Sequence, residues 1–141
     1  METRYATSSD VSSLGQLMTE LGYPTSSDEM AARIAAVANR ADHAMFVAVE
    51  DGAVAGMVAV STSPSLYRSD PQGAIVALVV SSRFRGCGVG ALLVGCGETW
   101  LRDNGVSYVT VKPSKHREDA HRLYARLGYE HTGLRFSKSL D

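Results

Sequence analysis

Two helices are predicted at the start of the chain from the spacing of its apolar residues. In the first segment apolar side chains recur every three or four residues, after Ser9 or Asp10 as the N-cap and before the stop Gly22-Tyr23-Pro24. These apolar positions are Val11, Leu14, Leu17, Met18 and Leu21. In the second segment Ser26 and Glu29 have the spacing of a capping box. The apolar positions that follow it are Met30, Ile34 and Val37.

Strands are predicted in the middle of the chain. Residues 43–49 and 54–60 are apolar runs joined by Asp51-Gly52, which is a strong hairpin signal. Residues 61–72 are polar and contain two prolines, which predicts a long loop. A further apolar run predicts a strand over 74–80.

The last part of the chain continues the alternation of helices and strands. It predicts a helix over about 88–103, a strand over 106–111, a short helix over 117–127 and a final strand over 129–138. Helices alternating with a mostly antiparallel sheet predict an α/β fold, namely a three-layer α/β/α sandwich with a mixed, mostly antiparallel central sheet. At 141 residues the chain is expected to form a single domain.

A basic, glycine-dense turn separates the strand at 74–80 from the following helix. Gly86, Gly88 and Gly90 occupy alternate positions behind Arg83 and Arg85. Glycines let a ligand approach the main chain, and the first N–H groups of a helix lack internal partners, so such a turn binds anions. The alternative is a tight turn with solvated arginines. Three alternating glycines in a strand–loop–helix context favour a phosphate site.

Two other phosphate-binding motifs fit the turn poorly. Gly86, Gly88 and Ala91 match the dinucleotide pattern G-x-G-x-x-G/A, but that pattern needs a second half of the fold and an acidic residue at the next strand end. Asp103 has the nearest spacing and lies at a predicted helix end. A Walker loop would need Gly-Lys-Ser/Thr, which is absent.

The turn instead resembles the acetyl-CoA loop of the GNAT superfamily of N-acetyltransferases, Q/R-x-x-G-x-G/A, at Arg85, Gly88 and Gly90. The segment at 116–129 is similar to the superfamily's late motif A-x-x-x-Y-x-x-x-G-F/Y. Its matching positions are Ala120, Tyr124, Gly128 and Tyr129. The resemblance covers residues 40–141 well and the first 40 loosely.

The resemblance implies acetyl-CoA as the donor, CoA as the product, and a set of residues that hold them. The strand backbone that pairs with pantetheine corresponds to Leu78, Val79 and Val80. The pyrophosphate cradle corresponds to Arg85, Gly86, Cys87, Gly88, Val89, Gly90 and Ala91. The far side of the cofactor corresponds to Ser114, Arg117 and Ala120. Tyr124 corresponds to the general acid that protonates the departing sulfur.

Several of these residues have a second interpretation. Tyr124 lies between Leu123 and Leu127 and could be a packed helix tyrosine, although its register with Ala120 and Gly128 favours the catalytic role. Cys87 is expected to contribute its backbone amide rather than a reactive thiol. His121 is more often a surface residue than a proton relay.

The sequence departs from the superfamily at the general base. Many members carry a glutamate at the position of Val76, and residues 75–80 contain no carboxylate. The acidic residues elsewhere that could act as a base are Glu20, Glu29, Glu50 and Asp51, and the sequence does not choose among them.

Charge and composition exclude several other classes of function. With 14 Lys and Arg against 15 Asp and Glu, the formal net charge is −1, which gives no basic field for a nucleic-acid partner. No apolar run reaches the roughly 18 residues that span a bilayer, and residues 1–10 lack the apolar core of a signal peptide. No membrane partner and a cytoplasmic location are therefore expected. Cys87 and Cys96 form no Cys/His cluster, so no metal site is expected.

These observations predict an acetyl-CoA-dependent N-acetyltransferase that acts on a small-molecule primary amine by direct transfer. A protein or peptide N-acetyltransferase is the catalytic alternative, and a CoA-binding module with weak or no catalysis is the non-catalytic one. Homodimers are common in the superfamily, but no motif in the sequence indicates one.

Overall fold

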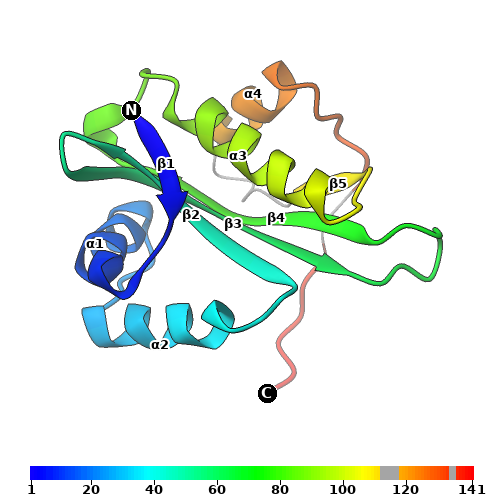
Figure 1. Ribbon diagram of the computed structural model, residues 1–141, viewed down its shortest axis with the longest axis horizontal. Coiled ribbons are helices and arrows are strands. Elements are labelled where there is room, and N and C mark those ends of the chain that lie inside the picture. The colour runs from blue at the N-terminus through cyan, green and yellow to red at the C-terminus, as the bar shows by residue number, and fades with distance from the viewer. Residues whose placement is uncertain (112–117, 134–135) are drawn as a thin grey trace. The chain divides into compact units, whose positions relative to one another are not determined.

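A mixed sheet with the strand order β1-β2-β3-β4-β5 organises the described part of the chain (Figure 1). Neighbouring strands are antiparallel, except that β4 and β5 are parallel. The strands are β1 (Glu2–Tyr5), β2 (His43–Glu50), β3 (Ala53–Ser63), β4 (Gln72–Val80) and β5 (Val109–Val111). The computed structural model describes residues 1–111, 118–133 and 136–141. Residues Met1–Val111 form one compact unit and Lys112–Asp141 form a second.

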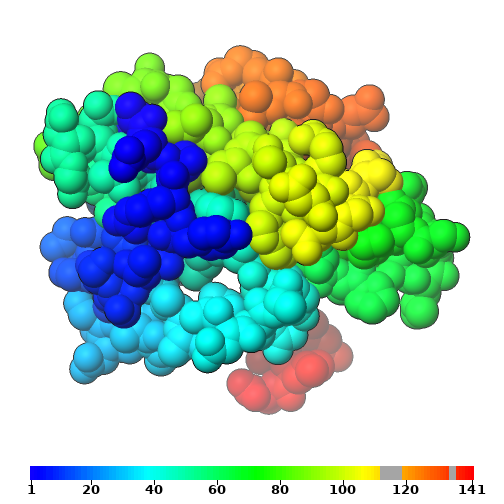
Figure 2. Space-filling model, in the orientation of Figure 1, coloured from blue at the N-terminus to red at the C-terminus, as the bar shows by residue number. Residues whose placement is uncertain are grey.

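Helices cover both faces of the sheet in the first unit. Figure 1 shows α1 (Val11–Leu21) and α2 (Ser27–Ala38) on one face and α3 (Val89–Asp103) on the opposite face. The core under α1 and α2 consists of Leu14, Leu17, Met30, Ile34, Val47, Met57 and Val79. The predicted three-layer α/β/α sandwich with a mostly antiparallel sheet is therefore confirmed. The strand β1 is visible on the surface, between α1 and α2 on one side and α3 on the other (Figure 2).

Two predicted local signals form as expected. The Ser26 hydroxyl accepts a hydrogen bond from the Glu29 N–H at 3.1 Å, and the Glu29 carboxylate accepts one from the Ser26 N–H at 3.0 Å. This capping box starts α2. Asp51 and Gly52 have φ values of 50° and 78°, which is the left-handed pair that closes a two-residue hairpin between β2 and β3.

Three helices end in the same glycine-based motif. Gly22 follows α1, Gly105 follows α3 and Gly128 follows α4 (Glu118–Arg126), each with φ between 84° and 108°. In each case the N–H of the residue after the glycine bonds a carbonyl five residues earlier. For α3 this bond joins Val106 N–H to the Leu101 carbonyl at 3.0 Å. This Schellman motif satisfies carbonyls that the helix end would leave unpaired.

The strand predicted over 106–111 was placed too early, because Val106 belongs to the Schellman motif at the end of α3. The Val106 N–H is used in the hydrogen bond to Leu101. The Val106 side chain is buried together with that of Leu101, and both lie beside Gly73. Pairing with β4 consequently begins only at Val109, and β5 is confined to Val109–Val111.

The sequence prediction was also wrong at both ends of the chain. The strand β1 was missed, because it has four residues, two of them charged, and lies at the sheet edge. Residues 129–133 and 136–141 form no strand, so the final strand predicted over 129–138 is not found in the described residues. There the Tyr129 N–H bonds the Tyr124 carbonyl at 2.9 Å, and Phe136 and Leu140 are exposed rather than packed.

The loop predicted over 61–72 is shorter than expected. The polar residues Ser61–Ser63 extend β3, and β4 already begins at Gln72. The connection is therefore residues 64–71. Leu66 and Tyr67 at its tip are both 95% exposed.

The strand β4 contains a β-bulge at Val76. Neighbouring residues Val60 and Ala59 of β3 pair with Ile75 and Ala77, so Val76 is the extra residue. An extra residue reverses the face to which later side chains point. Ala77 consequently packs against the core under α1 and α2, while Val76 is 55% exposed.

Glycines on α3 give a stability prediction. A Cβ on Gly97 would lie 2.9 Å from Cγ1 of the fully buried Val60, whereas a Cβ on Gly95 would meet nothing within 4 Å. We expect Gly97→Ala to lower the free energy of unfolding by about 1–3 kcal/mol through overpacking. Gly95→Ala should raise it by about 0.5–1 kcal/mol, because alanine is the better helix former. Urea unfolding measures the free energy of unfolding of both variants. Equal changes in the two variants would contradict close packing of α3 on β3.

Candidate functional site

The turn between β4 and α3 is held by two side chains that sequence analysis did not assign to it. The buried Ser81 hydroxyl accepts a hydrogen bond from the Arg83 N–H at 3.3 Å and starts a 3₁₀ turn over Ser82–Phe84. The Glu20 carboxylate of α1 accepts one from the Ser82 N–H at 3.1 Å. Both bonds fix the entry to the glycine-rich segment. The contact of Glu20 has no local sequence signal, because 62 residues separate it from Ser82.

The glycine-rich segment forms an open cradle of backbone. Gly86 and Gly88 have φ values of 78° and 80°, and a Cβ on either would meet nothing within 4 Å. The first intrahelical bond of α3 is donated by Leu92 to the Gly88 carbonyl at 3.1 Å. The N–H groups of Val89, Gly90 and Ala91 therefore precede the first helical hydrogen bond and sit at the positive end of the helix dipole.

The charge and exposure of this segment suit a diphosphate. Arg83 and Arg85 are exposed, and the Arg83 guanidinium lies 5.6 Å from the centre of the Phe84 ring. Cys87 is exposed, and its thiol lies 3.8 Å from the Arg85 carbonyl. The Val89 side chain is buried, so only its backbone faces the cradle side. Exposed cations, bare amides and left-handed glycines together fit the pyrophosphate of CoA.

The end of β4 leads directly into this cradle. Leu78, Val79 and Val80 pair with β3 on one edge of the strand. On the other edge the pairing with β5 covers only Gly73 to Ile75, and no other described strand adjoins residues 76–80. The Val79 side chain is buried in the core, so its contribution to a ligand is limited to the backbone. A strand edge without a partner among the described residues can bind an extended chain through main-chain hydrogen bonds.

The four acidic residues considered as bases lie in different environments. Glu29 caps α2, Glu50 lies 3.5 Å from the N-terminal ammonium, and Asp51 is in the exposed hairpin turn. Of these four residues, only Glu20 has a described hydrogen bond to the turn between β4 and α3. Hydrogen bonding from the side chain and the N–H of Ser82, with a smaller contribution from the charge of Arg85, holds the pKa of Glu20 below its ordinary value. A lowered pKa makes Glu20 a weak base.

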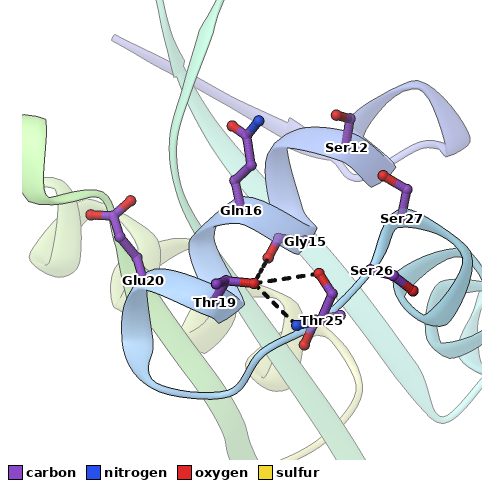
Figure 3. Close-up of a pocket in the computed structure, with 8 residues that line it drawn as sticks. All are labelled: Ser12, Gly15, Gln16, Thr19, Glu20, Thr25, Ser26 and Ser27. Atoms are coloured by element: carbon purple, nitrogen blue, oxygen red, sulfur yellow. Dashed lines mark hydrogen bonds between the residues drawn. The ribbon is translucent and has the colours of Figure 1, made fainter.

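A polar cleft of about 540 Å³ lies between α1 and the start of α2 (Figure 3). Its lining is dominated by hydroxyl groups and consists of Ser12, Gly15, Gln16, Thr19, Glu20, Thr25, Ser26 and Ser27. Thr19 fixes the two walls together: its hydroxyl donates to the Gly15 carbonyl at 2.9 Å and accepts from the Thr25 N–H at 3.0 Å.

The remaining predicted residues belong to the second unit. Ala120 and Tyr124 lie one turn apart on α4, and Tyr124 is 6% exposed. The Tyr124 ring packs edge-on against Tyr129, with ring centres 5.5 Å apart. The predicted contacts Ser114 and Arg117 lie outside the described residues.

The part of the chain that the structure describes contains neither a candidate metal site nor a helix that could span a membrane. No group of three or more His, Cys, Asp or Glu side chains there could hold a metal ion. Likewise, none of the described helices combines the length and the apolar character needed to cross a membrane.

Comparison with known proteins gives a family and a relative. A model of the acetyltransferase (GNAT) family matches residues 12–129. The chain is 33% identical over 141 residues to an aminoalkylphosphonate N-acetyltransferase of Salmonella typhimurium strain LT2, covering 99% of this chain and 91% of the relative.

Solved structures share the fold of this chain. An acetyltransferase from Trypanosoma brucei aligns with a TM-score of 0.82 and 26% identity over 99% of each chain. An aminoglycoside N-acetyltransferase in complex with CoA aligns with a TM-score of 0.87 and 19% identity over 99% of this chain and 95% of the other.

Proposed function

Since this chain belongs to the acetyltransferase (GNAT) family, we propose that it moves an acetyl group from acetyl-CoA directly to the primary amine of a small molecule. Its membership makes it an N-acetyltransferase, so the sequence-based alternative of a CoA-binding module without catalysis is set aside. We further propose that residues 1–141 act as one N-acetyltransferase domain, in accord with a curated relative that covers 99% of the chain. A cytoplasmic location and a homodimer stay predictions.

The similarity to the aminoalkylphosphonate N-acetyltransferase is the observation that carries the choice of a small acceptor. The alignment spans both proteins almost completely, so the acceptor-binding part of the relative has a counterpart here. Aminoalkylphosphonates are therefore the first acceptors to test.

We assign the binding of the donor, acetyl-CoA, to the cradle and to the edge of β4 that precedes it. The backbone amides of Gly86 to Ala91, with Arg85, would hold the pyrophosphate, and Leu78 to Val80 would pair with the pantetheine arm. A backbone donor on this strand would also stabilise the oxygen of the thioester carbonyl as negative charge develops on it. Ala120 is assigned to the far side of the cofactor by its motif position alone.

The transfer needs three proton movements besides the attack. The ammonium form of the acceptor loses one proton to solvent, and its nitrogen then forms the amide bond to the acetyl carbon. The carbon–sulfur bond breaks, and Tyr124 gives its proton to the sulfur and regains one from the amide nitrogen. The products are the acetamide, CoA with a free thiol, and one proton.

Thiol release from acetyl-CoA tests the proposal across a panel of acceptors. We expect turnover with 2-aminoethylphosphonate and related small primary amines, in preference to an aminoglycoside such as sisomicin or a peptide α-amine. Preference for the peptide would instead favour the protein or peptide N-acetyltransferase. No release with any amine would reject the proposed function.

Gly88→Val is expected to raise the dissociation constant of acetyl-CoA at least about tenfold, which corresponds to about 1.4 kcal/mol. Gly88 has open space where a Cβ would lie, on the cradle that we assign to the pyrophosphate. A valine there would block the approach of the phosphates to the main chain. Isothermal calorimetry with CoA measures the change.

Gly52→Val is the matched control for backbone strain. Gly52 has a φ of 78° against 80° for Gly88, and it also faces open space, but it lies in the β2–β3 hairpin. Valine is strained at both positions. A folded Gly88→Val protein that binds CoA as tightly as Gly52→Val would remove the cradle from the donor site.

A further inference from the structure

The Glu20 carboxylate of α1 contacts the turn that leads into the cradle. It accepts a hydrogen bond from the Ser82 N–H at 3.1 Å, and Ser82 is the first residue of the 3₁₀ turn before the glycine-rich segment. In Figure 3 the Glu20 side chain points away from Thr25 and Ser27, which lie on the other wall of the cleft. Glu20 is therefore directed at the turn rather than into the cleft.

The helix α1 gives no local reason for a glutamate at this position. It ends at Leu21 and is followed by Gly22 with a φ of 108°, so Glu20 lies in its last turn. A negative charge is unfavourable there, because the carbonyl end of a helix carries a partial negative charge. Leu14 and Leu17 of the same helix are buried in the core. The helix is thus a fixed support for a carboxylate whose described hydrogen bond is to the turn.

The start of the turn is held by backbone groups and by Glu20. The Ser81 N–H donates to the Ala55 carbonyl of β3 at 2.8 Å, and the Phe84 N–H donates to the Ser81 carbonyl at 3.0 Å. The Ser82 N–H lies between them and donates to the Glu20 carboxylate. Of these three bonds, only the last depends on a side chain, so a substitution can remove it without changing the backbone.

We propose that Glu20 is a positioning residue for acetyl-CoA: by holding Ser82, it keeps Arg85 and the cradle amides in the geometry that binds the pyrophosphate. This inference rests on the proposed function, because it takes the cradle as the site of CoA. Glu20 does not bind the cofactor directly, since its charge has the same sign as the phosphates and would repel them. Arg85 is close enough for its charge to help lower the pKa of Glu20, which agrees with a carboxylate beside the cradle.

The test compares the dissociation constants of CoA in Glu20→Ala and Glu20→Gln by isothermal calorimetry. Alanine removes the acceptor of the Ser82 N–H, so we expect the dissociation constant to rise about three- to tenfold. Glutamine keeps an acceptor oxygen, so its value should stay within about twofold of the unmodified protein. An unchanged constant in Glu20→Ala, or an equal rise in both variants, would overturn the inference.

Glu29→Ala is the matched control for the loss of such a carboxylate. Glu29 is also exposed and accepts a backbone N–H, that of Ser26 at 3.0 Å, but it caps α2 and not the turn. Its substitution should lower the thermal stability and leave the dissociation constant of CoA unchanged. If Glu29→Ala weakens CoA binding as much as Glu20→Ala does, the effect follows from lower stability alone and the inference fails.

Ser82→Pro shows whether the effect of Glu20 acts through Ser82. Proline has neither the N–H nor the hydroxyl, and it is favoured as the first residue of a helical turn. Ser81 before it has a ψ of 139°, which suits a residue that precedes proline. In Ser82→Pro, adding Glu20→Ala should change the dissociation constant of CoA by less than about twofold. A further three- to tenfold loss would mean that Glu20 acts elsewhere, and would contradict the inference.

The KM for acetyl-CoA and kcat should respond differently to Glu20→Ala. The KM should rise, while kcat at saturating acetyl-CoA should stay within about twofold. With S-acetylpantetheine, which has the same arm and no pyrophosphate, kcat/KM should equal that of the unmodified protein. An equal loss with both donors would overturn the inference and leave the proposed function intact. If no amine is acetylated, the proposed function fails by itself, and calorimetry with CoA still decides the role of Glu20.

Discussion

Tyr124→Phe is expected to lower kcat by about 10²- to 10⁴-fold and to leave the dissociation constant of acetyl-CoA nearly unchanged. The substitution keeps the ring and removes only the hydroxyl that would protonate the departing sulfur. Because the ring is 6% exposed and packs edge-on against Tyr129, its packing should survive. Steady-state kinetics with the best acceptor of the panel, and calorimetry with CoA, measure the two quantities.

Tyr129→Phe is the matched control, because it removes the hydroxyl from the other ring of the same pair. It should leave kcat within a small factor of the unmodified enzyme. Thermal unfolding of both variants shows whether either hydroxyl matters for stability. If kcat of Tyr124→Phe is unchanged while chemistry limits the rate, Tyr124 is a packing residue only.

The packing alternative has a concrete structural basis. Tyr124 lies at the last turn of α4, where its carbonyl accepts the Tyr129 N–H at 2.9 Å, and Gly128 has a φ of 91°. The contact between these two tyrosines is the hydrophobic pair that usually accompanies a Schellman motif. The spacing Tyr-x-x-x-Gly-Tyr thus has a reason in helix termination alone. This is why the catalytic role of Tyr124 needs the kinetic test.

Local chemistry explains what the sequence predicted well. The capping box of Ser26 and Glu29 and the Asp51-Gly52 turn depend on residues within four positions of each other. Their geometry can therefore be predicted from a short segment of sequence. The cradle is of the same kind, because Gly86 and Gly88 supply left-handed backbone between a strand and a helix. The proposal that the anion is the pyrophosphate of CoA comes from the family resemblance and not from this local geometry.

Contacts between distant residues explain what the sequence did not predict. The strand β1 is too short and polar to be recognised without its partner β2, to which it pairs from Glu2 to Tyr5. Asp10, one of the two N-cap residues predicted for the first helix, is the N-cap residue of α1, but its side chain makes no capping hydrogen bond to that helix. Its carboxylate is instead buried against the Arg4 guanidinium, at 2.8 and 2.9 Å. The hydrogen bond from the Arg4 guanidinium is the main reason why the pKa of the Asp10 carboxyl lies below its ordinary value, and the hydrogen bond from the Thr7 N–H also lowers it.

The bulge at Val76 shows the same limit within the site. The run of apolar residues in β4 predicts a regular strand, whereas pairing with β3 leaves Val76 as an extra, exposed residue. Only the register of two strands reveals that the position occupied by a glutamate in many family members faces outward here. The exposed position is apolar, so β4 offers the acceptor no base at this point.

The second large expected effect is on the pH dependence of kcat/KM, because β4 has no carboxylate at Val76. An amine with a lysine-like pKa near 10.4 is neutral in only about one molecule in 2,500 at pH 7, a handicap of about 4.6 kcal/mol. If bulk equilibrium supplies the neutral amine, kcat/KM should rise about tenfold per pH unit from pH 6 toward the pKa of the acceptor. Over three pH units the expected increase is about 10³-fold.

Acceptors of different basicity and the candidate carboxylates give this prediction its controls. An amine of lower pKa starts from a larger neutral fraction at pH 7, so its profile should level off earlier, although its nitrogen is a weaker nucleophile. Glu20→Gln should leave the slope of the profile unchanged, because a carboxylate with a lowered pKa is already ionised throughout this range. A plateau that begins near pH 6 to 7 with a high-pKa amine would instead reveal a tuned base. Substituting Glu20, Glu29, Glu50 and Asp51 one at a time would then identify it, since loss of the true base restores the tenfold rise per pH unit.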